Sequence, residues 1–132
     1  MSRGREAPPA MSNVTDEFNA ITEHFSPRVI AMANGQYFKL AKFKGEFPFH
    51  AHADEDEFFL VHRGEFTMCY RDREVVLKTG DFHVVPRGVE HRPRATEEAW
   101  VMFVEPAATK HTGDAETEFT KSIEQQTAHL QT

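Results

Sequence analysis

The sequence has almost no cysteine and no long apolar run. Cys69 is the one cysteine among 132 residues, so an internal disulfide is excluded and the sequence fits a reducing compartment, which we take to be the cytoplasm. Cys69 lies in an apolar, strand-like run, which indicates a buried core residue rather than a nucleophile. No apolar stretch approaches the length needed to span a membrane, so we expect no membrane partner.

Positive charge is also scarce. The chain carries 15 Lys and Arg residues against 21 Asp and Glu residues, which gives a net charge of −6. Binding to nucleic acid requires a basic stripe, so we expect no nucleic-acid partner. We interpret the short cluster of Arg87, Arg92 and Arg94 as a solvated rim, although Arg92 or Arg94 could instead bind a substrate carboxylate through paired hydrogen bonds.

The length fits one domain with terminal extensions. Residues 1–12 are basic and Pro-rich with no apolar segment behind them, so we interpret them as a disordered leader and not as a secretory signal. Residues 13–106 form the expected domain. Residues 107–132 form a polar C-terminal tail, in which Phe119 and Ile123 could share one helical turn.

A short helix is expected at the start of the domain. Its apolar residues recur at intervals of three and four, which places them on one face: Val14, Phe18, Ile21 and Phe25. Asn13 is a suitable N-cap, and Ser26-Pro27 is expected to end the helix.

Residues 28–105 have the pattern of an all-β domain. Short segments rich in Val and Phe alternate with Gly, Pro and Asp, which is typical of a sandwich or barrel. The expected strands include Phe47–His52, His91–Ala95 and Ala99–Glu105. In the strand at Phe47–His52, alternation directs His50 and His52 to one face and Phe47 and Phe49 to the other. We expect these outward Phe residues to form a partner surface and therefore predict a homodimer.

The two histidines also point to a metal. Glu57 begins the next expected strand, and a tight acidic turn would bring it back toward His50 and His52. His91 follows a Pro-x-Gly turn much later in the chain. Three imidazoles and one carboxylate suit a divalent transition metal. The rivals of Glu57 are Asp54, Glu55 and Asp56, but Glu57 borders the apolar strand. The other histidines are interpreted as ordinary core or surface residues: His24, His62, His83, His111 and His129.

Two segments resemble the paired motifs of the cupins. Residues 45–64 match the first motif, Gly, His-x-His, Glu and Gly, and residues 80–95 match the second, Gly, Pro-x-Gly and His. Four residues rather than five separate Gly45 from His50, and Ala95 replaces the final Asn of the family. Three shorter segments, residues 56–61, 85–93 and 104–107, are similar to those of small bacterial single-domain cupins. That group is often described as a cupin 2 conserved barrel or as mannose-6-phosphate-isomerase-like.

The resemblance implies a fold and a metal site, and the chemistry of that site suggests the candidate activities. The fold is a cupin double-stranded β-helix, or jelly-roll, barrel. The implied ligands of one metal ion are His50, His52, Glu57 and His91. Iron, manganese and nickel suit this set, and zinc is a further candidate, with fewer open positions. We expect a metalloenzyme that acts on a small oxygenated, anionic molecule, as a dioxygenase first and an isomerase or decarboxylase next. The alternative is a non-catalytic module that binds or senses a small ligand.

Alternation also predicts the lining of the barrel. If Glu57 points inward, Phe59 and Val61 do so as well. Phe66, Met68 and Tyr70 share one face of their strand and are expected to face the core. Possible proton donors near the site, each more simply explained as structural, are Tyr37, Tyr70 and His83. Trp100 and Met102 are expected to pack.

Overall fold

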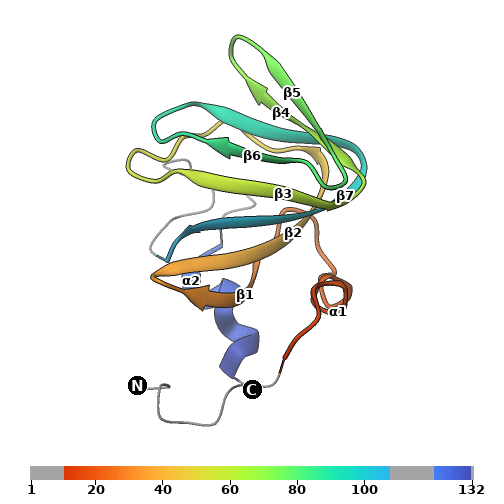
Figure 1. The fold of residues 1–132 in the computed structure, drawn as a ribbon, viewed down its shortest axis with the longest axis vertical. Coiled ribbons are helices and arrows are strands. Elements are labelled where there is room, and N and C mark those ends of the chain that lie inside the picture. Colours follow the sequence, from red (N-terminus) through yellow and green to blue (C-terminus); the bar gives the residue numbers. More distant parts are fainter. Residues whose placement is uncertain (1–10, 108–120, 132) are drawn as a thin grey trace.

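The structure, a computed structural model, describes residues 11–107 and 121–131. Most of the predicted leader, and residues 108–120 of the predicted tail with His111 and Phe119, lie outside the described residues. Within the described part the body is built from strands, with short helices at its two ends (Figure 1). The predicted all-β jelly-roll barrel is confirmed.

Seven strands form the sheet system. Their bounds are β1 (Arg28–Ala33), β2 (Gln36–Glu46), β3 (Glu57–Arg63), β4 (Glu65–Tyr70), β5 (Glu74–Lys78), β6 (Phe82–Val85) and β7 (His91–Pro106). All pairings between these strands are antiparallel. One path through the sheet runs β1-β2-β7-β3-β6, while β4 pairs with β5 and with β7.

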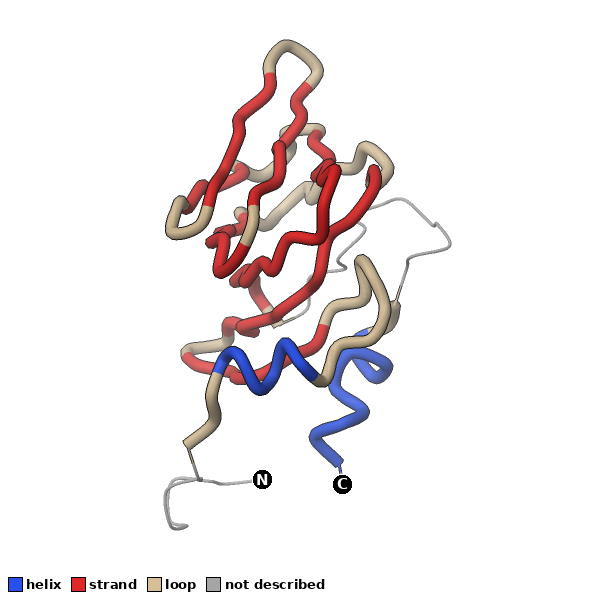
Figure 2. Tube along the Cα trace, turned by 90° about the vertical axis from the view of Figure 1, so that its right-hand side faces the viewer, coloured by secondary structure: helices blue, strands red, loops and turns tan. Residues whose placement is uncertain are grey.

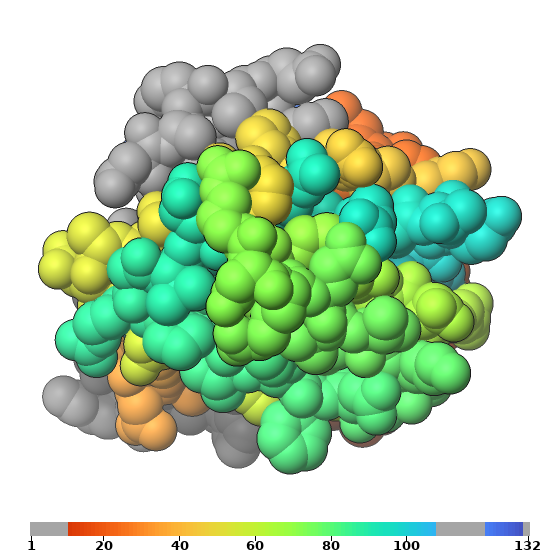
Figure 3. Space-filling view, turned by 90° about the horizontal axis from the view of Figure 1, so that it is seen from above, coloured from red at the N-terminus to blue at the C-terminus, as the bar shows by residue number. Residues whose placement is uncertain are grey.

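The long strand β7 joins the two layers of the barrel. Its first residues pair with β4, from Tyr70↔His91 to Thr67↔Arg94. Its later residues lie between β2 and β3, with Phe103 paired to Lys39 on one side and Phe59 on the other. The predicted strands His91–Ala95 and Ala99–Glu105 are therefore one continuous strand. The hairpin of β4 and β5 covers the end of the molecule seen in Figure 3.

The barrel interior is aromatic and apolar. Strand alternation buries Phe59 and Val61 on β3, as predicted, and Phe66 and Met68 on β4. Phe43 of β2 meets Phe66 edge to face, with ring centroids 5.2 Å apart. Cys69 is also buried, which confirms the structural interpretation of this residue. These side chains fill one core and leave polar groups near the end where His50 lies.

The N-terminal helix is shorter than expected. Helix α1 (Val14–Asn19) begins at the predicted cap, where the Asn13 side chain accepts a hydrogen bond from the backbone N–H of Asp16. Phe18 packs on Trp100 outside the barrel. Phe25 does not continue the helix, because its backbone N–H bonds to the carbonyl of Lys42 and its ring stacks on Phe43 in the barrel core. Tertiary packing therefore replaces the last predicted turns.

The segment before β3 differs most from its predicted structure. Residues 47–52 form no regular strand, and the pairing there is an isolated bridge between His50 and His91. The prediction that Phe47 points away from the His50 side is wrong, because Phe47 is buried and its ring meets that of His50 at 5.2 Å. Phe49 is covered by the guanidinium groups of Arg71 and Arg92, so it forms no free apolar surface.

The C-terminal residues described by the structure form a second short helical element. Helix α2 (Ile123–Thr127) continues into the 3-10 helix η1 (Ala128–Gln131), and both lie beside β1, at the end of the molecule away from the β4–β5 hairpin (Figures 1 and 2). The ring of His129 lies 2.7 Å from the carbonyl oxygen of Val29. Among the described residues, no helix combines the length and apolar character that crossing a membrane requires.

Candidate metal centre

Four side chains from distant parts of the sequence meet at one end of the barrel. His50 and His52 come from the segment before β3, Glu57 from the first residue of β3 and His91 from the first residue of β7. All are buried, and one potential ligand atom from each lies within 4.8 Å of the others. The structure thus brings together the whole predicted set and none of the other described histidines.

Backbone carbonyl groups orient two of the imidazoles. Nδ1 of His50 lies 2.9 Å from the carbonyl oxygen of Pro48, and Nδ1 of His91 lies 2.8 Å from that of Val89. A carbonyl can only accept, so Nδ1 donates in both rings and Nε2 is turned toward the other members of the group. Such a bond on the far side of the ring is the usual way to fix a metal-ligating histidine.

The turn before His91 also holds the loop of His52. The backbone N–H of Gly88 donates to the carbonyl of His52 at 2.7 Å, and the N–H of Arg87 donates to the Asp56 carboxylate at 2.8 Å. Asp56 therefore stabilises the turn, and like Asp54 it is exposed. The alternative acidic ligands are excluded by this arrangement, since Glu57 alone among them is buried beside the imidazoles.

Glu57 links the group electrostatically. One of its oxygens lies 2.9 Å from Nε2 of His52 and 3.2 Å from Nε2 of His91. Burial acts to raise the pKa of Glu57, but its close polar contacts with His52, His91 and Glu105 outweigh burial and hold the pKa well below its usual range. The group therefore contains one carboxylate anion among three imidazoles.

The imidazole of His50 is held in its neutral form. Burial, and next the charge of His91, lower its pKa from 6.5 to about 4. A metal ion binds the neutral imidazole, so this environment leaves His50 ready to coordinate at neutral pH.

The donor set and its size fit one divalent transition metal ion. Donor atoms that lie about 2 Å from one ion are within about 4 Å of each other. The four potential ligand atoms, now within 4.8 Å of one another, would therefore move only slightly closer together to bind an ion. Three nitrogen donors and one oxygen donor suit iron, manganese, nickel or zinc better than magnesium or calcium, which prefer oxygen ligands.

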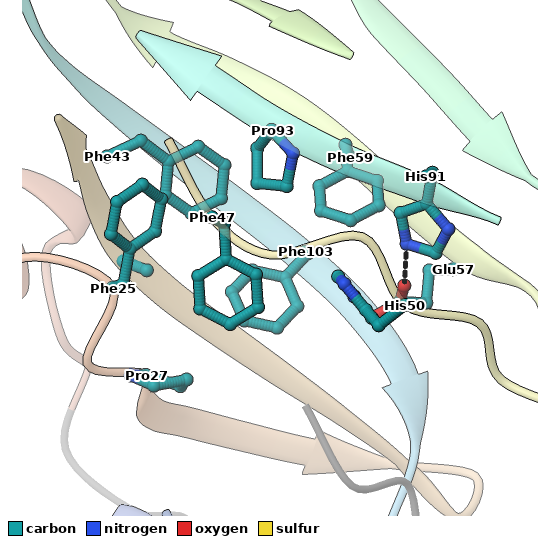
Figure 4. Close-up of a pocket in the computed structure, with 11 residues that line it drawn as sticks. Phe25, Pro27, Phe43, Phe47, His50, Glu57, Phe59, His91, Pro93 and Phe103 are labelled. Atoms are coloured by element: carbon teal, nitrogen blue, oxygen red, sulfur yellow. Dashed lines mark hydrogen bonds and ion pairs between the residues drawn. The ribbon is translucent and has the colours of Figure 1, made fainter. Parts of the chain in front are cut away.

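An apolar cavity of about 30 Å³ adjoins three of the four side chains (Figure 4). Phe43, Phe47, Phe59 and Phe103 line it, and His50, Glu57 and His91 form its polar end. Arg92 and Arg94 do not line it. Arg94 instead forms two hydrogen bonds to the Glu74 carboxylate, at 3.0 and 3.1 Å, and Arg92 lies 3.4 Å from Glu46. The structure therefore assigns these arginines to the rim.

Sequence reasoning missed two charged residues next to Glu57. Lys39 and Glu105 are both fully buried, and their charged atoms lie 2.8 Å apart. Burial and the adjacent Glu57 raise the pKa of Glu105 well above its usual range, although Lys39 acts to lower it. Strand alternation was the signal that could have shown the inward position of Lys39, because Lys39 shares the inward face of Ala41 and Phe43.

The predicted proton donors are placed differently from one another. The hydroxyl of Tyr70 lies 2.6 Å from Nε2 of His83, on two strands that reach the site from the hairpin side. Burial lowers the pKa of His83 and raises that of Tyr70. Tyr37 is half-buried on β2, where it pairs with Glu105 of β7. Trp100 packs against Phe18, as expected of a structural residue.

Comparison with known proteins agrees with this geometry. The family model described as the cupin domain matches residues 37–107. A cupin-2 domain protein of Shewanella frigidimarina, known as a crystal structure, is 46% identical, with 72% of this chain and 93% of that chain covered and a TM-score of 0.71. A protein of Neisseria meningitidis is 26% identical, with coverages of 74% and 99% and a TM-score of 0.68.

One curated protein also has a similar sequence. The uncharacterised protein YdbB of Bacillus subtilis is 36% identical over 86 residues, which are 64% of this chain and 76% of the relative. The matched family region contains all four clustered side chains and both motifs. The chain belongs to the cupin family, among its small bacterial cupin-2 proteins.

Proposed function

We propose that this protein is a metal-dependent cupin and that His50, His52, Glu57 and His91 hold one divalent transition metal ion. One observation carries the proposal: four buried donor groups converge, with one potential ligand atom from each within 4.8 Å of the others. Burying such polar groups costs free energy unless they are paired or bound to a metal. Four protein ligands leave two open positions around an octahedral ion.

The proposed activity is the conversion of a small oxygenated organic molecule. A bound ion would supply Lewis acidity and a template for two oxygen atoms. Oxidative cleavage of the dioxygenase type is the first candidate reaction, and isomerisation or decarboxylation is the next. The chain's own contribution is to orient the ligands through Pro48 and Val89 and to exclude water with the surrounding Phe side chains.

The cavity modifies the expectation of an anionic substrate. Its lining contains no lysine or arginine to neutralise a carboxylate, and Arg92 and Arg94 are paired elsewhere. A buried charge without a partner is costly. We therefore propose a substrate whose oxygen atoms reach the metal and whose remaining body is neutral and apolar.

The size of the cavity favours a second candidate function. About 30 Å³ holds one or two water-sized groups, so a larger substrate needs Phe side chains to move. A non-catalytic cupin that binds or senses a very small ligand needs no such movement. A ligand that is retained by the metal-loaded protein without being converted, under aerobic and anaerobic conditions alike, would favour this module over the enzyme.

The metal proposal is tested by the metal content of purified protein. We expect close to one equivalent of a transition metal in the wild type and a loss of most of it in His50→Ala, because one ligand is then missing. The measurement is elemental analysis by mass spectrometry. His24→Ala is the control, since His24 is an exposed histidine bonded to Glu98 at 2.8 Å, far from the group in the sequence and the fold. Equal metal in His50→Ala and the wild type would remove the basis for the site.

We also propose that the protein is a homodimer in the cytoplasm. The predicted partner surface of Phe47 and Phe49 is wrong, but the outer face of β3 and β6 offers another. Phe82 and Val84 are 68% and 49% exposed there, with Phe58 and Leu60 beside them. The location in the cytoplasm stays a prediction from the cysteine content.

A further inference from the structure

A lysine and a glutamate are enclosed in the barrel next to the proposed metal ligands. The side chains of Lys39 and Glu105 are 0% exposed, and Nζ of Lys39 lies 2.8 Å from a carboxylate oxygen of Glu105. Removing two charges from water costs several kcal/mol per ion, and an apolar pair of similar volume is often equally stable or more stable. The pair therefore calls for an explanation beyond the stability of the barrel.

The strand register explains how the pair reaches Glu57. On β3 and β7, Phe58 pairs with Val104 and Phe59 pairs with Phe103, so the same register places Glu57 beside Glu105. Both side chains point inward and are buried, and each carboxyl group acts on the pKa of the other, so the two groups lie close together. On the other side of β7, Lys39 pairs with Phe103, one diagonal step from Glu105, which a long side chain spans.

These contacts form one continuous line. It runs from Lys39 on β2 through Glu105 on β7 to Glu57 on β3, and from Glu57 to the rings of His52 and His91. Each of the three strands contributes one buried charged side chain to this line. Glu105 is thus in contact with the proposed carboxylate ligand but not with the imidazoles.

We propose that Glu105, anchored by Lys39, is a positioning residue that orients the Glu57 carboxylate for metal binding. The inference rests on the proposed function, since it assigns the outer partner of one proposed ligand. A carboxylate that binds a metal is commonly held in place by a polar contact with a second residue. Removal of that second residue typically weakens metal affinity about 10- to 100-fold. Lys39 fixes the position of Glu105 and balances the second carboxyl group inside the barrel.

The test compares metal affinity with stability in matched variants. The double variant Lys39→Met/Glu105→Met replaces the ion pair by apolar side chains of similar length. We expect its metal-free form to unfold at a urea concentration equal to or above that of the wild type, and its affinity for Ni²⁺ to fall about 10- to 100-fold. Affinity is measured by competition with a chelating dye at fixed pH. A merely structural role would change the urea midpoint and leave the affinity of the folded protein unaltered.

A conservative variant tests the polar contact between Glu105 and Glu57 itself. The amide of Glu105→Gln can donate to Glu57 and accept from Lys39, so its Ni²⁺ affinity should stay within about threefold of the wild type. This nearly isosteric variant decides the matter alone if the double variant does not fold. Glu17→Gln is the control for loss of an ion pair, since Glu17 bonds to Arg28 outside the barrel at 3.0 Å.

The outcomes separate the two proposals. A folded double variant that binds Ni²⁺ as tightly as the wild type would overturn the positioning role and leave the metal site standing. Ni²⁺ binding by Glu105→Gln as weak as that by the double variant would also overturn it, because the retained polar side chain at position 105 would then have no effect. A wild type that binds neither Ni²⁺ nor another transition metal would overturn the proposed function and this inference together.

Discussion

The imidazole of His50 is nearly sealed from solvent and faces a second imidazole, that of His91, with ring centroids 4.4 Å apart. In metal-free protein its pKa is about 4, whereas in the unfolded chain it returns to about 6.5. Between these two pH values His50 is protonated in the unfolded chain but not in the folded protein, so the free energy of unfolding falls as the pH is lowered. From pH 7 to pH 5 this residue should account for a loss of about 2 kcal/mol.

The neutral variant His50→Gln isolates this contribution. Urea unfolding of metal-free protein at pH 7 and pH 5 should show a decrease in the free energy of unfolding that is about 2 kcal/mol larger for the wild type than for His50→Gln. The raised pKa of Glu105 acts in the opposite direction, but it is present in both proteins and largely cancels in the difference. The same decrease in both proteins would mean that His50 is protonated in the fold at pH 5.

At the scale of elements, alternation along strands predicted much and failed where the chain leaves a strand. It placed Glu57, Phe59 and Val61 inward because β3 is a regular strand. It misplaced Phe47, since residues 47–52 are held by tertiary contacts such as the bond from the Phe47 N–H to the carbonyl of Pro93. His50 and His52 still converge, because the bridge to His91 positions them rather than the pleat of a strand.

The charged pair in the barrel was missed for a different reason. Lysine and glutamate are almost never fully buried unless paired, so sequence reasoning assigns them to the surface. Lys39 and Glu105 lie 66 positions apart, and only the pairing of β2 with β7 brings them together. A pattern within one strand can show that a charge faces inward, but it cannot show its partner.

Gly64, in the turn between β3 and β4, should tolerate a larger side chain poorly. Gly64 has a φ of +86°, and a Cβ atom there would lie 3.0 Å from the carbonyl oxygen of Glu98 and 3.3 Å from Cα of Ala99. Gly80 has nearly the same φ, +89°, and open space around it. Gly80→Ala should cost about 1–2 kcal/mol for the left-handed backbone alone. Gly64→Ala should cost more, about 3 kcal/mol, because backbone atoms must also move.

Chemical denaturation of the two glycine variants measures this difference. The pair is matched in residue, substitution and backbone angle, so any excess loss in Gly64→Ala reports the close approach of β3–β4 to the Glu98 region. Equal losses would show that the segment around Glu98 moves aside at no cost.

At the scale of the whole molecule, the outer surface of the sheet bears on how the protein could assemble. Phe58 pairs with Val84 and Leu60 with Phe82, so these residues form one apolar patch on the outer face of β3 and β6. Phe58 and Phe82 stack with ring centroids 5.8 Å apart. In the path through the sheet β6 is the last strand, so the patch extends to an edge. An apolar surface of this kind, used by both copies about a twofold axis, is typical of homodimers.

The dimer is tested by charge placed in the middle of the patch. Phe82→Glu should convert a dimer to a monomer, because two buried carboxylates would face each other across a twofold axis without a counter-charge. The measurement is molar mass by light scattering during size-exclusion chromatography. Val76→Glu is the matched control, since Val76 is a similarly exposed apolar residue, 52%, on β5 of the separate hairpin. If Phe82→Glu and Val76→Glu both keep the dimeric mass, the interface lies elsewhere, and a monomeric wild type would refute the dimer itself. Because the patch faces away from the cavity, metal content should be unchanged in Phe82→Glu, so assembly and the metal site can be judged independently.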